Sequence, residues 1–506
     1  DEGYRYLMSL AALPILVPLA AGALSVAFWR SVAAQRAIAL AGTLILLFVS
    51  ILLLQQVHAE GIVVLHMGDW QAPLGITLAV DMLGAIMVVL TGITALAIAL
   101  FSLGDTPERH EKFGYYPLMH LLLAGVAGSF VTGDIFNLYV WFEVMLIASF
   151  ALLTLGGERA QMEGAIKYVT LNLFSSAIFL SAVGILYGLV GTLNMADIAQ
   201  KLGQVEDTGM VNVVAVMFMV AFGIKASAFP LFFWLPASYH TPLVGVSALF
   251  AGLLTKVGVY SLFRMFTVVF DHDVGYTHTI LLWVAALTML SGVLGAAAQF
   301  EFRRILSFHI ISQIGYMILG LALYTPLAII GGVFYIMHHI IVKTTLFLVS
   351  GVTYRLTGTH ELSELGNFYR ERPMLSVLFL IPAFSLAGMP PLSGFFAKLI
   401  VIRAGIEAEA WTVTAVALVV GLLTLYSMVK IWAEVFWKAA PEQASTEQPE
   451  PRTEGLAWMY VAIAGLAACT IFIGLNGQPI YDLAEVAAEQ LMQPQGYIDA
   501  VLEGRP

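Results

Sequence analysis

Charged residues are scarce in this chain of 506 residues, at 11% of the total against 60% hydrophobic residues. The mean hydropathy is +0.88, which leaves too little polar surface to cover a soluble protein of this length. We therefore expect a polytopic membrane protein whose main contact is the lipid bilayer. The net charge is -10 and no basic patch stands out, so a nucleic-acid partner is excluded.

Cysteine is almost absent, since Cys469 is the single one, and a disulfide framework or cysteine-based metal site is therefore excluded. The sequence also lacks a glycine-rich phosphate loop, a Gly-x-Ser-x-Gly nucleophile motif, a His-Glu-x-x-His motif and a pair of membrane aspartates. These absences argue against an enzyme. We expect no cofactor and no metal.

Apolar runs of about 18 residues or more predict an all-α protein with about fourteen membrane spans. We place the spans near residues 6–28, 34–56, 80–103, 114–131, 134–155, 163–190, 210–239, 243–270, 277–298, 301–323, 327–356, 373–403, 410–437 and 456–475. The first lacks a basic leader and is interpreted as an uncleaved span. Residues 441–454 resemble a linker, and the tail after Gly477 is interpreted as an interfacial helix.

Basic residues in the connections predict the orientation. With the N-terminus outside, thirteen of them fall on the inner side: Arg30, Arg36, Arg109, Lys112, Arg159, Lys167, Arg303, Arg304, Arg355, Arg370, Arg372, Lys438 and Arg452. The outer side receives five: Arg5, Lys201, Arg264, Arg403 and Arg505. This distribution follows the positive-inside rule, and an even number of spans places both termini on the outer side.

Internal similarity predicts two five-helix repeats. Gly252-Leu253-Leu254-Thr255 recurs as Gly421-Leu422-Leu423-Thr424, and the run that ends at Pro230 has a counterpart that ends at Pro390 and Pro391. A proline inside a span breaks the helix, so each repeat should contain one broken helix. The predicted units are residues 1–112 (three helices), 113–270 (first repeat), 271–438 (second repeat) and 439–506 (linker, last helix and tail).

Five lysines fall inside predicted spans, where each costs about 2.5 to 3.5 kcal/mol at the bilayer centre. They are Lys225, Lys256, Lys343, Lys398 and Lys430. Lys225 precedes the first helix break and Lys398 follows the second. Glu143, also within a span, is the expected partner of Lys225. The alternatives are structural: lysines that cap freed carbonyls, and a protonated glutamic acid that packs by hydrogen bonds.

Histidines add to this set in the tenth and eleventh spans. His339 and Lys343 are four residues apart and share a helical face, with His338 beside them. A histidine can relay protons near neutral pH, and His309 would extend such a relay, although a satisfied helix-end residue is an equal reading. For Lys430, near the inner end of its span, a structural role is favoured.

Several of these runs together resemble the D subunits of Mrp-type multisubunit cation/proton antiporters. The resemblance covers the chain from about the third to the thirteenth span. It is carried by Gly223-Ile224-Lys225-Ala226, Phe229-Pro230-Leu231-Phe232-Phe233-Trp234-Leu235-Pro236, Ser238-Tyr239-His240-Thr241-Pro242, Leu254-Thr255-Lys256-Val257-Gly258-Val259-Tyr260, His338-His339-Ile340-Ile341-Val342-Lys343-Thr344 and Gly388-Met389-Pro390-Pro391-Leu392-Ser393-Gly394-Phe395. The runner-up is an antiporter-like subunit of respiratory complex I or a related hydrogenase, in which we expect Asp-Ala-His after Trp-Leu-Pro rather than Ala237-Ser238-Tyr239-His240.

This resemblance implies a subunit of a Na⁺/H⁺ antiporter in a prokaryotic plasma membrane, serving ion transport and pH homeostasis. It implies fourteen spans in which the two five-helix repeats have inverted orientation, partners of the Mrp A, B, C, E, F and G types, and a proton path along the midplane. It also implies key roles for Glu143, Lys225, Lys256, Lys343 and Lys398. With the histidines, we expect a relay from Glu143 through Lys225, Lys256, His309, His339 and Lys343 to Lys398. An alternative of another class is a structural membrane subunit with no transport path of its own.

Overall fold

The computed structural model describes residues 9–441 and 453–503. The predicted start of the first span at residues 6–8 and most of the predicted linker 441–454 lie outside these ranges. Most described residues are helical, and the described ranges also contain a short hairpin in which β1 (Val63–His66) pairs antiparallel with β2 (Thr77–Val80). The fold is thus the expected all-α membrane bundle.

The helices of the first half correspond to the predicted spans. They are α2 (Leu13–Ala27), α3 (Val32–Glu60), α4 (Met82–Asp105), α5 (Glu108–Lys112), α6 (Tyr115–Val131), α7 (Ile135–Thr154), α8 (Arg159–Val190), α9 (Met195–Leu202), α10 (Thr208–Ala226), α11 (Trp234–Ser238), α12 (Val244–Leu249) and α13 (Thr255–Arg264). The short 3₁₀ turn η1 (Met67–Asp69) lies in the hairpin, while η2 (Phe250–Leu254) and η3 (Met265–Val269) are π-helical and flank α13.

The second half continues in the same way. Its helices are α14 (Val274–Ala297), α15 (Phe302–Leu323), α16 (Pro326–Thr357), α17 (Phe368–Glu371), α18 (Pro373–Ala387), α19 (Ser393–Glu407), α20 (Trp411–Ile431), α21 (Leu456–Leu475), α22 (Gly477–Met492) and α23 (Gln495–Leu502). A 3₁₀ turn, η4 (Leu362–Glu364), follows α16, and a π-helical segment, η5 (Trp432–Trp437), continues α20.

Fourteen apolar segments can cross a membrane by composition. Eleven described helices are long and apolar enough to span it, and three shorter apolar helices, α2, α6 and α18, complete the set. Even the predicted boundary between the fourth and fifth spans is confirmed, since α6 ends at Val131 and α7 starts at Ile135. Asp134 caps α7 by accepting a hydrogen bond from the Asn137 amide at 2.7 Å.

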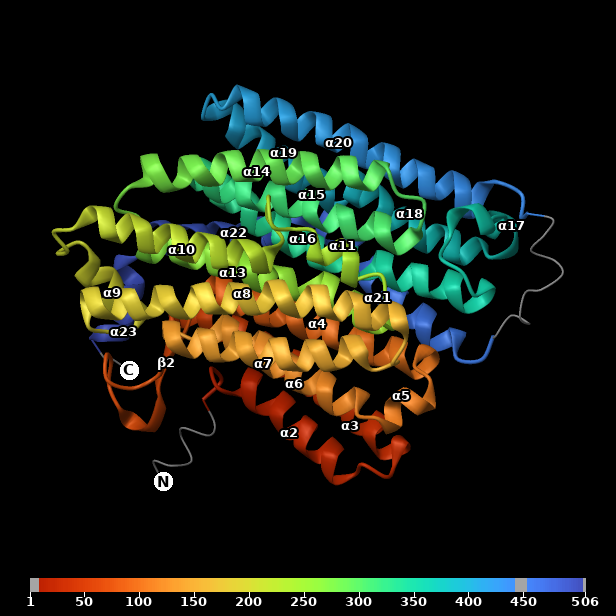
Figure 1. Ribbon diagram of the computed structural model, residues 1–506, viewed down its shortest axis with the longest axis horizontal. Coiled ribbons are helices and arrows are strands. Elements are labelled where there is room, and N and C mark those ends of the chain that lie inside the picture. The colour runs from red at the N-terminus through yellow and green to blue at the C-terminus, as the bar shows by residue number, and fades with distance from the viewer. Residues whose placement is uncertain (1–8, 442–452, 504–506) are drawn as a thin grey trace.

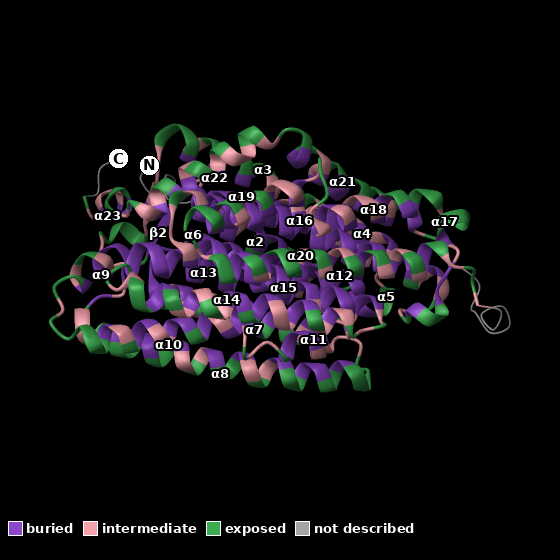
Figure 2. Cartoon of the chain, turned by 90° about the horizontal axis from the view of Figure 1, so that it is seen from above, coloured by how far each residue is buried: buried purple, intermediate pink, exposed green. Residues whose placement is uncertain are grey.

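The long helices run side by side between two ends of the molecule (Figure 1). The hairpin, α9 and α23 lie at one end, which we call the hairpin end, and α5 and α17 lie at the other, the α5–α17 end. The central helices α4, α13, α15 and α16 are mostly buried, whereas α8 shows an exposed face (Figure 2). Residues that face outward are largely apolar, including Leu173, Phe174 and Leu422, as expected for contact with lipid.

The two five-helix units of the bundle have similar structures in opposite orientations. Helices α8 and α16 are both 32 residues long and both end at a left-handed glycine, Gly191 or Gly358. A short backbone bridge from Asp134 to Asn194 lies at the hairpin end. The corresponding bridge from Glu301 to Glu361 lies beside the opposite end, so the two five-helix units have inverted orientation.

Each repeat contains one broken helix, as the prolines predicted. The first break separates α10 from α11 and includes Pro230. The indole of Trp234 donates at 3.1 Å to the carbonyl of Ile224, which also accepts from the Ser227 amide at 3.1 Å. The second break separates α18 from α19 and includes Pro390 and Pro391. These interruptions lie within protein, where backbone groups find partners that lipid cannot supply.

The C-terminal segment does not lie apart from the bundle. Helix α22 packs against α16 and α4, and α23 packs against α9. The buried face of α22 consists of small residues, Ala484, Ala487 and Ala488, with Leu491. The interfacial helix that we expected after Gly477 is therefore an intramolecular cover over α16 and α4 that ends at the hairpin end.

Candidate functional site

Ionisable side chains from both repeats are buried in the centre of the bundle. Lys256, Lys343, His309, His338 and His339 have no exposed surface. Lys225 and Lys398 are 4% and 6% exposed. Most of the predicted relay is therefore held away from solvent and lipid, and each group must find polar partners within the protein.

Lys225 occupies the last turn of α10, directly before the first helix break. Its ammonium donates to Asn172 Oδ1 of α8 at 3.3 Å. It also lies 5.9 Å from the ring centre of Phe142 and 6.0 Å from that of Tyr168. An amide oxygen and two aromatic faces thus surround this cation.

The predicted ion pair between Glu143 and Lys225 is wrong as a direct contact. No ion pair joins the two side chains in the described part of the chain, because the Lys225 ammonium is directed to Asn172. Glu143 is close enough to act on Lys225 through its charge, and its buried Oε1 has no hydrogen-bond partner among the described residues. The carboxylate is therefore a nearby charge rather than a ligand of the lysine.

Lys256 follows the π-helical turn η2 and points back into it. Its ammonium donates to the carbonyl of Ala251, which the π-helical geometry leaves available. Helix α13 also touches α10, because a Cβ at Gly258 would lie 2.6 Å from the Ala226 amide nitrogen. Helices α10 and α13, which carry Lys225 and Lys256, therefore pack directly against each other.

The same turn connects the first repeat to α16 of the second. A Cβ at Gly252 would lie 2.4 Å from Thr344 Oγ1, the residue after Lys343. The charges of Lys256 and Lys343 act on each other across this contact. His339 is also near Lys256, and both of its ring nitrogens are buried without a partner in the described structure.

Lys343 reaches from α16 to α15, where it donates to the Leu306 carbonyl at 3.3 Å. His309 lies one turn further along α15. Its Nδ1 contacts Ser312 Oγ at 3.2 Å, while Nε2 is buried without a partner within the described ranges. The structure thus brings His309 beside the His339 and Lys343 pair, as the predicted relay requires.

A hydrogen-bonded chain continues from His309 toward Lys398. Ser312 accepts a bond from Gln313 Nε2 at 3.0 Å, and the Gln313 Oε1 accepts one from the Tyr335 hydroxyl. The ring of Tyr335 stacks on that of Tyr316 with 5.1 Å between centroids. The Lys398 ammonium lies 5.3 Å from the centre of the Tyr316 ring.

At the second helix break, Lys398 also donates to the freed carbonyl of Leu386 at 2.8 Å. The structural reading of a lysine that caps free carbonyls therefore describes part of what Lys398 does. His338 joins the same break, because its Nδ1 contacts Ser393 Oγ at 2.8 Å, and Ser393 contacts Ser385 at 2.8 Å. His338 is thus well placed beside the break.

Lys430 binds backbone carbonyls at a helix end and, among the described residues, makes no hydrogen bond to the other lysines and histidines of the predicted relay. Its ammonium donates to three backbone carbonyls that follow the end of α14 or belong to it: Ala296 at 3.4 Å, Ala297 at 2.9 Å and Gln299 at 2.7 Å. The C-terminus of a helix carries a partial negative charge, so a lysine ammonium at this position is favourable. The structural role favoured from sequence fits this geometry.

A cavity of about 510 Å³ opens at the α5–α17 end. Charged and titratable side chains from α4 and from both repeats line it, among them Asp105, Glu158, Arg303, Arg355 and His360. His360 follows α16 in a loop, and its burial and the nearby Arg303 guanidinium hold its pKa well below the usual 6.5. The polar walls make this cavity accessible to water.

Sequence reasoning missed the neutral polar residues that connect the charged ones. They are Asn172, Ser312, Gln313, Tyr316, Tyr335, Ser385 and Ser393. An amide inside an apolar span was an available signal for Asn172 and Gln313. The sequence prediction that Arg264 lies in an outer connection is wrong. Arg264 is the last residue of α13, is 1% exposed and forms an ion pair with Asp81.

The fold and the site together define a class of membrane protein: polytopic transporter subunits with two inverted repeats, two broken helices and a buried row of lysines and histidines. Residues 132–424 match the family described as "NADH:quinone oxidoreductase/Mrp antiporter, TM". The chain is 48% identical over 495 residues to the D-type subunit of the Na⁺/H⁺ antiporter of Alkalihalophilus pseudofirmus, covering 98% of this chain and 99% of the relative.

Solved structures agree with this relationship. A chain of the Mrp complex from a Dietzia species has a TM-score of 0.89 and 32% identity, with coverage of 98% of this chain and 100% of the other. A chain of respiratory complex I from Thermus thermophilus has a TM-score of 0.79 and 25% identity, with coverage of 95% and 99%. The protein therefore belongs to the NADH:quinone oxidoreductase/Mrp antiporter transmembrane family.

Proposed function

We propose that this chain is the proton-translocating subunit of a multisubunit Na⁺/H⁺ antiporter. It is a transporter subunit rather than an enzyme, and it moves protons along its midplane. The groups that carry the proton are Glu143, Lys225, Lys256, His339, Lys343, His309 and Lys398, with His338 beside the second break.

One observation supports this proposal above the others: the buried titratable groups form a row that passes from one repeat to the other. Each step uses a contact between neighbouring helices, from α10 to α13 at Gly258, from η2 to α16 at Gly252, and from α16 to α15 at Lys343. A buried lysine without an ion-pair partner holds its proton weakly, so a small change in a neighbouring charge can release it.

We propose the assembly from these relatives and the orientation from the distribution of basic residues. The relatives are subunits of Na⁺/H⁺ antiporters and one structural neighbour is part of an Mrp complex, so we assign Mrp-type partner subunits and a prokaryotic plasma membrane. The basic residues gather at the α5–α17 end, which we assign to the inner side. Both termini are then outside, and the repeats comprise residues 113–270 and 271–438.

The complex I alternative has weaker support. The identity to the antiporter relative from Alkalihalophilus pseudofirmus is 48%, and the identity to the complex I chain is 25%. Purification of the native complex separates these readings: small antiporter subunits support the proposal, whereas flavin and iron-sulfur subunits would replace it with the complex I assignment.

The test of the relay compares two lysine substitutions in the assembled complex. Lys256→Met keeps the length of the side chain and removes the titratable group from the middle of the row. It should abolish Na⁺-dependent proton movement in everted vesicles at normal complex content. Lys201→Met is the matched control, because its half-exposed lysine pairs with Asp197 in α9 outside the row, and it should retain antiport.

The structural-subunit alternative predicts another pattern. In that case Lys256→Met would lower the amount of assembled complex and leave the antiport of each assembled complex unchanged. Normal antiport by assembled Lys256→Met would refute the proton relay.

A further inference from the structure

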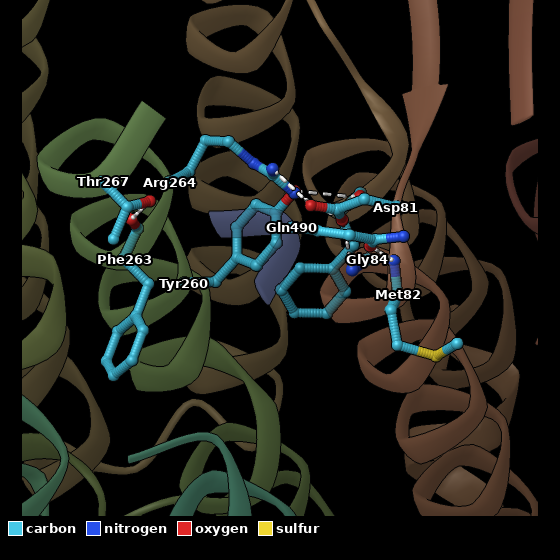
Figure 3. Close-up of polar contacts among 9 residues, drawn as sticks. Asp81, Met82, Gly84, Tyr260, Phe263, Arg264, Thr267 and Gln490 are labelled. Carbon is cyan, nitrogen blue, oxygen red and sulfur yellow. Dashed lines mark hydrogen bonds and ion pairs between the residues drawn. The ribbon is translucent and has the colours of Figure 1, made fainter. Parts of the chain in front are cut away.

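A buried ion pair closes the hairpin end of the first repeat. The Arg264 guanidinium binds both oxygens of Asp81, at 2.6 and 2.7 Å (Figure 3). The two side chains are 1% and 2% exposed. A buried ion pair is often no more stabilising than an apolar pair of similar size, so its presence between α4 and α13 calls for another explanation.

This pair lies on the same face of α13 as a member of the proton row. Lys256, Tyr260 and Arg264 are spaced four residues apart, so their side chains form a column along one face of the helix. The helical rise carries this column about 12 Å from Lys256 toward the hairpin end. The Tyr260 hydroxyl lies 3.0 Å from Arg264 Nη2 and donates to the Phe130 carbonyl at 3.1 Å.

Three hydrogen bonds hold Asp81 in place. Its Oδ1 accepts from Arg264 and, at 2.9 Å, from the Gly84 amide, while Oδ2 accepts from Arg264. Arg264 therefore engages both oxygens of the carboxylate. The guanidinium stays charged at all working pH values and repels an approaching cation.

The C-terminal helices cover this pair from the hairpin end. The ring of Tyr497 in α23 lies 5.2 Å from the Arg264 guanidinium carbon, and its buried hydroxyl has no partner among the described residues. Gln490 of α22 accepts a hydrogen bond from the Met82 amide at 2.7 Å (Figure 3). The other ionisable groups near the pair are Tyr260 and Asp134.

We propose that the Asp81–Arg264 pair is a gate on a branch of the proton path that leads from Lys256 to the hairpin end. While the pair is intact, Arg264 excludes protons and occupies the carboxylate that could accept them. Separation of the pair frees Asp81 to take a proton from the column and pass it outward. The π-helical segments on both sides of α13 allow this helix to shift, and Tyr497 limits the opening.

If the pair is a gate, substitutions of its two residues should have different effects on the Na⁺-independent leak. If the pair is only structural, both substitutions should have the same effect. Arg264→Gln removes the barrier and leaves a carboxyl group in the path. The reconstituted complex should then dissipate an imposed pH gradient without Na⁺ roughly tenfold faster than the wild type. Asp81→Asn leaves the guanidinium uncompensated, so it should lower antiport without any increase in this leak.

The gate rests on the proposed function, and a double variant separates the two. The leak of Arg264→Gln should disappear in Lys256→Met/Arg264→Gln, because the column starts at Lys256. If Lys256→Met retains antiport, the proton relay is refuted whatever Arg264→Gln does. If Lys256→Met loses antiport but Arg264→Gln does not leak, the gate alone is refuted.

A milder variant covers the case in which Arg264→Gln fails to assemble. Tyr497→Ala removes the cover from the pair and should increase the Na⁺-independent leak. Tyr187→Ala, which removes an exposed tyrosine of α8, should not. Absence of a leak in assembled Tyr497→Ala would overturn the gate.

Discussion

Asn172 provides the side-chain oxygen that the Lys225 ammonium contacts, and a single substitution tests whether this oxygen sets how readily the lysine releases its proton. In Asn172→Asp a carboxylate oxygen replaces the amide oxygen that lies 3.3 Å from the Lys225 ammonium. Two unit charges at that separation attract each other by about 5 kcal/mol at an effective dielectric constant of about 20. Desolvation of the new carboxylate offsets part of this attraction.

The remaining attraction favours the protonated lysine and slows its release of the proton. A net effect of only about 1.4 kcal/mol is a factor of ten, so we expect Na⁺-dependent proton movement in everted vesicles to fall by at least that factor. The fall should occur at unchanged complex content, because the substitution preserves the size of the side chain and supplies an ion pair.

Asn137→Asp is the matched control. Asn137 lies in the first turn of the neighbouring helix α7, where a negative charge is favourable, and its Oδ1 accepts from the Trp141 indole at 2.9 Å, a bond that a carboxylate can also accept. This variant should exchange ions normally. Wild-type antiport by Asn172→Asp would refute the idea that proton release from Lys225 depends on its neutral partner.

Two further predictions concern the second helix break and the cavity at the α5–α17 end. In Gly394→Ala the new Cβ would meet the Ser385 carbonyl oxygen at 1.6 Å, an overlap that should cost about 1 to 3 kcal/mol or more and lower both antiport and the thermal midpoint of the complex. Gly184→Ala, with open space around its Cβ, should lower neither antiport nor the thermal midpoint. A thermal midpoint of Gly394→Ala equal to that of the wild type would contradict the close approach of Gly394 to Ser385. Burial, with Arg303, lowers the pKa of His360 below 6.5 in the folded protein, so the unfolded chain binds the proton first and stability should fall as the pH drops below 6.5. His360→Gln should reduce that loss in thermal melts across this range, and an unchanged pH dependence would show that His360 is not its source.

The prolines and the buried charges were readable from the sequence because each is unfavourable in a lipid environment. Pro230, Pro390 and Pro391 predicted the two helix breaks, and the breaks are present. The apolar runs predicted all fourteen crossing segments, since length and composition determine what can span a bilayer. For Lys430 the sequence favoured a structural role because of its position near a span end, and its ammonium donates to backbone carbonyls at the end of α14.

The errors came from contacts between residues far apart in the chain. Glu143 was expected to bind Lys225, yet Asn172 takes that position. Arg264 was counted as an exposed connection residue, yet it pairs with Asp81, 183 residues away. A charge near a span end looks the same in the sequence whether it faces water or another helix, so no local pattern distinguishes these cases.

The sequence by itself determined the class of this protein, its spans, its broken helices and the charged groups that must be buried. Those properties follow from the free energy of placing each residue type in a membrane, which depends on local composition. Only the tertiary structure decided which groups touch. The neutral bridge from His309 through Gln313 to Tyr335 and the closed pair at Arg264 depend on how helices pack, and packing is set by the whole chain.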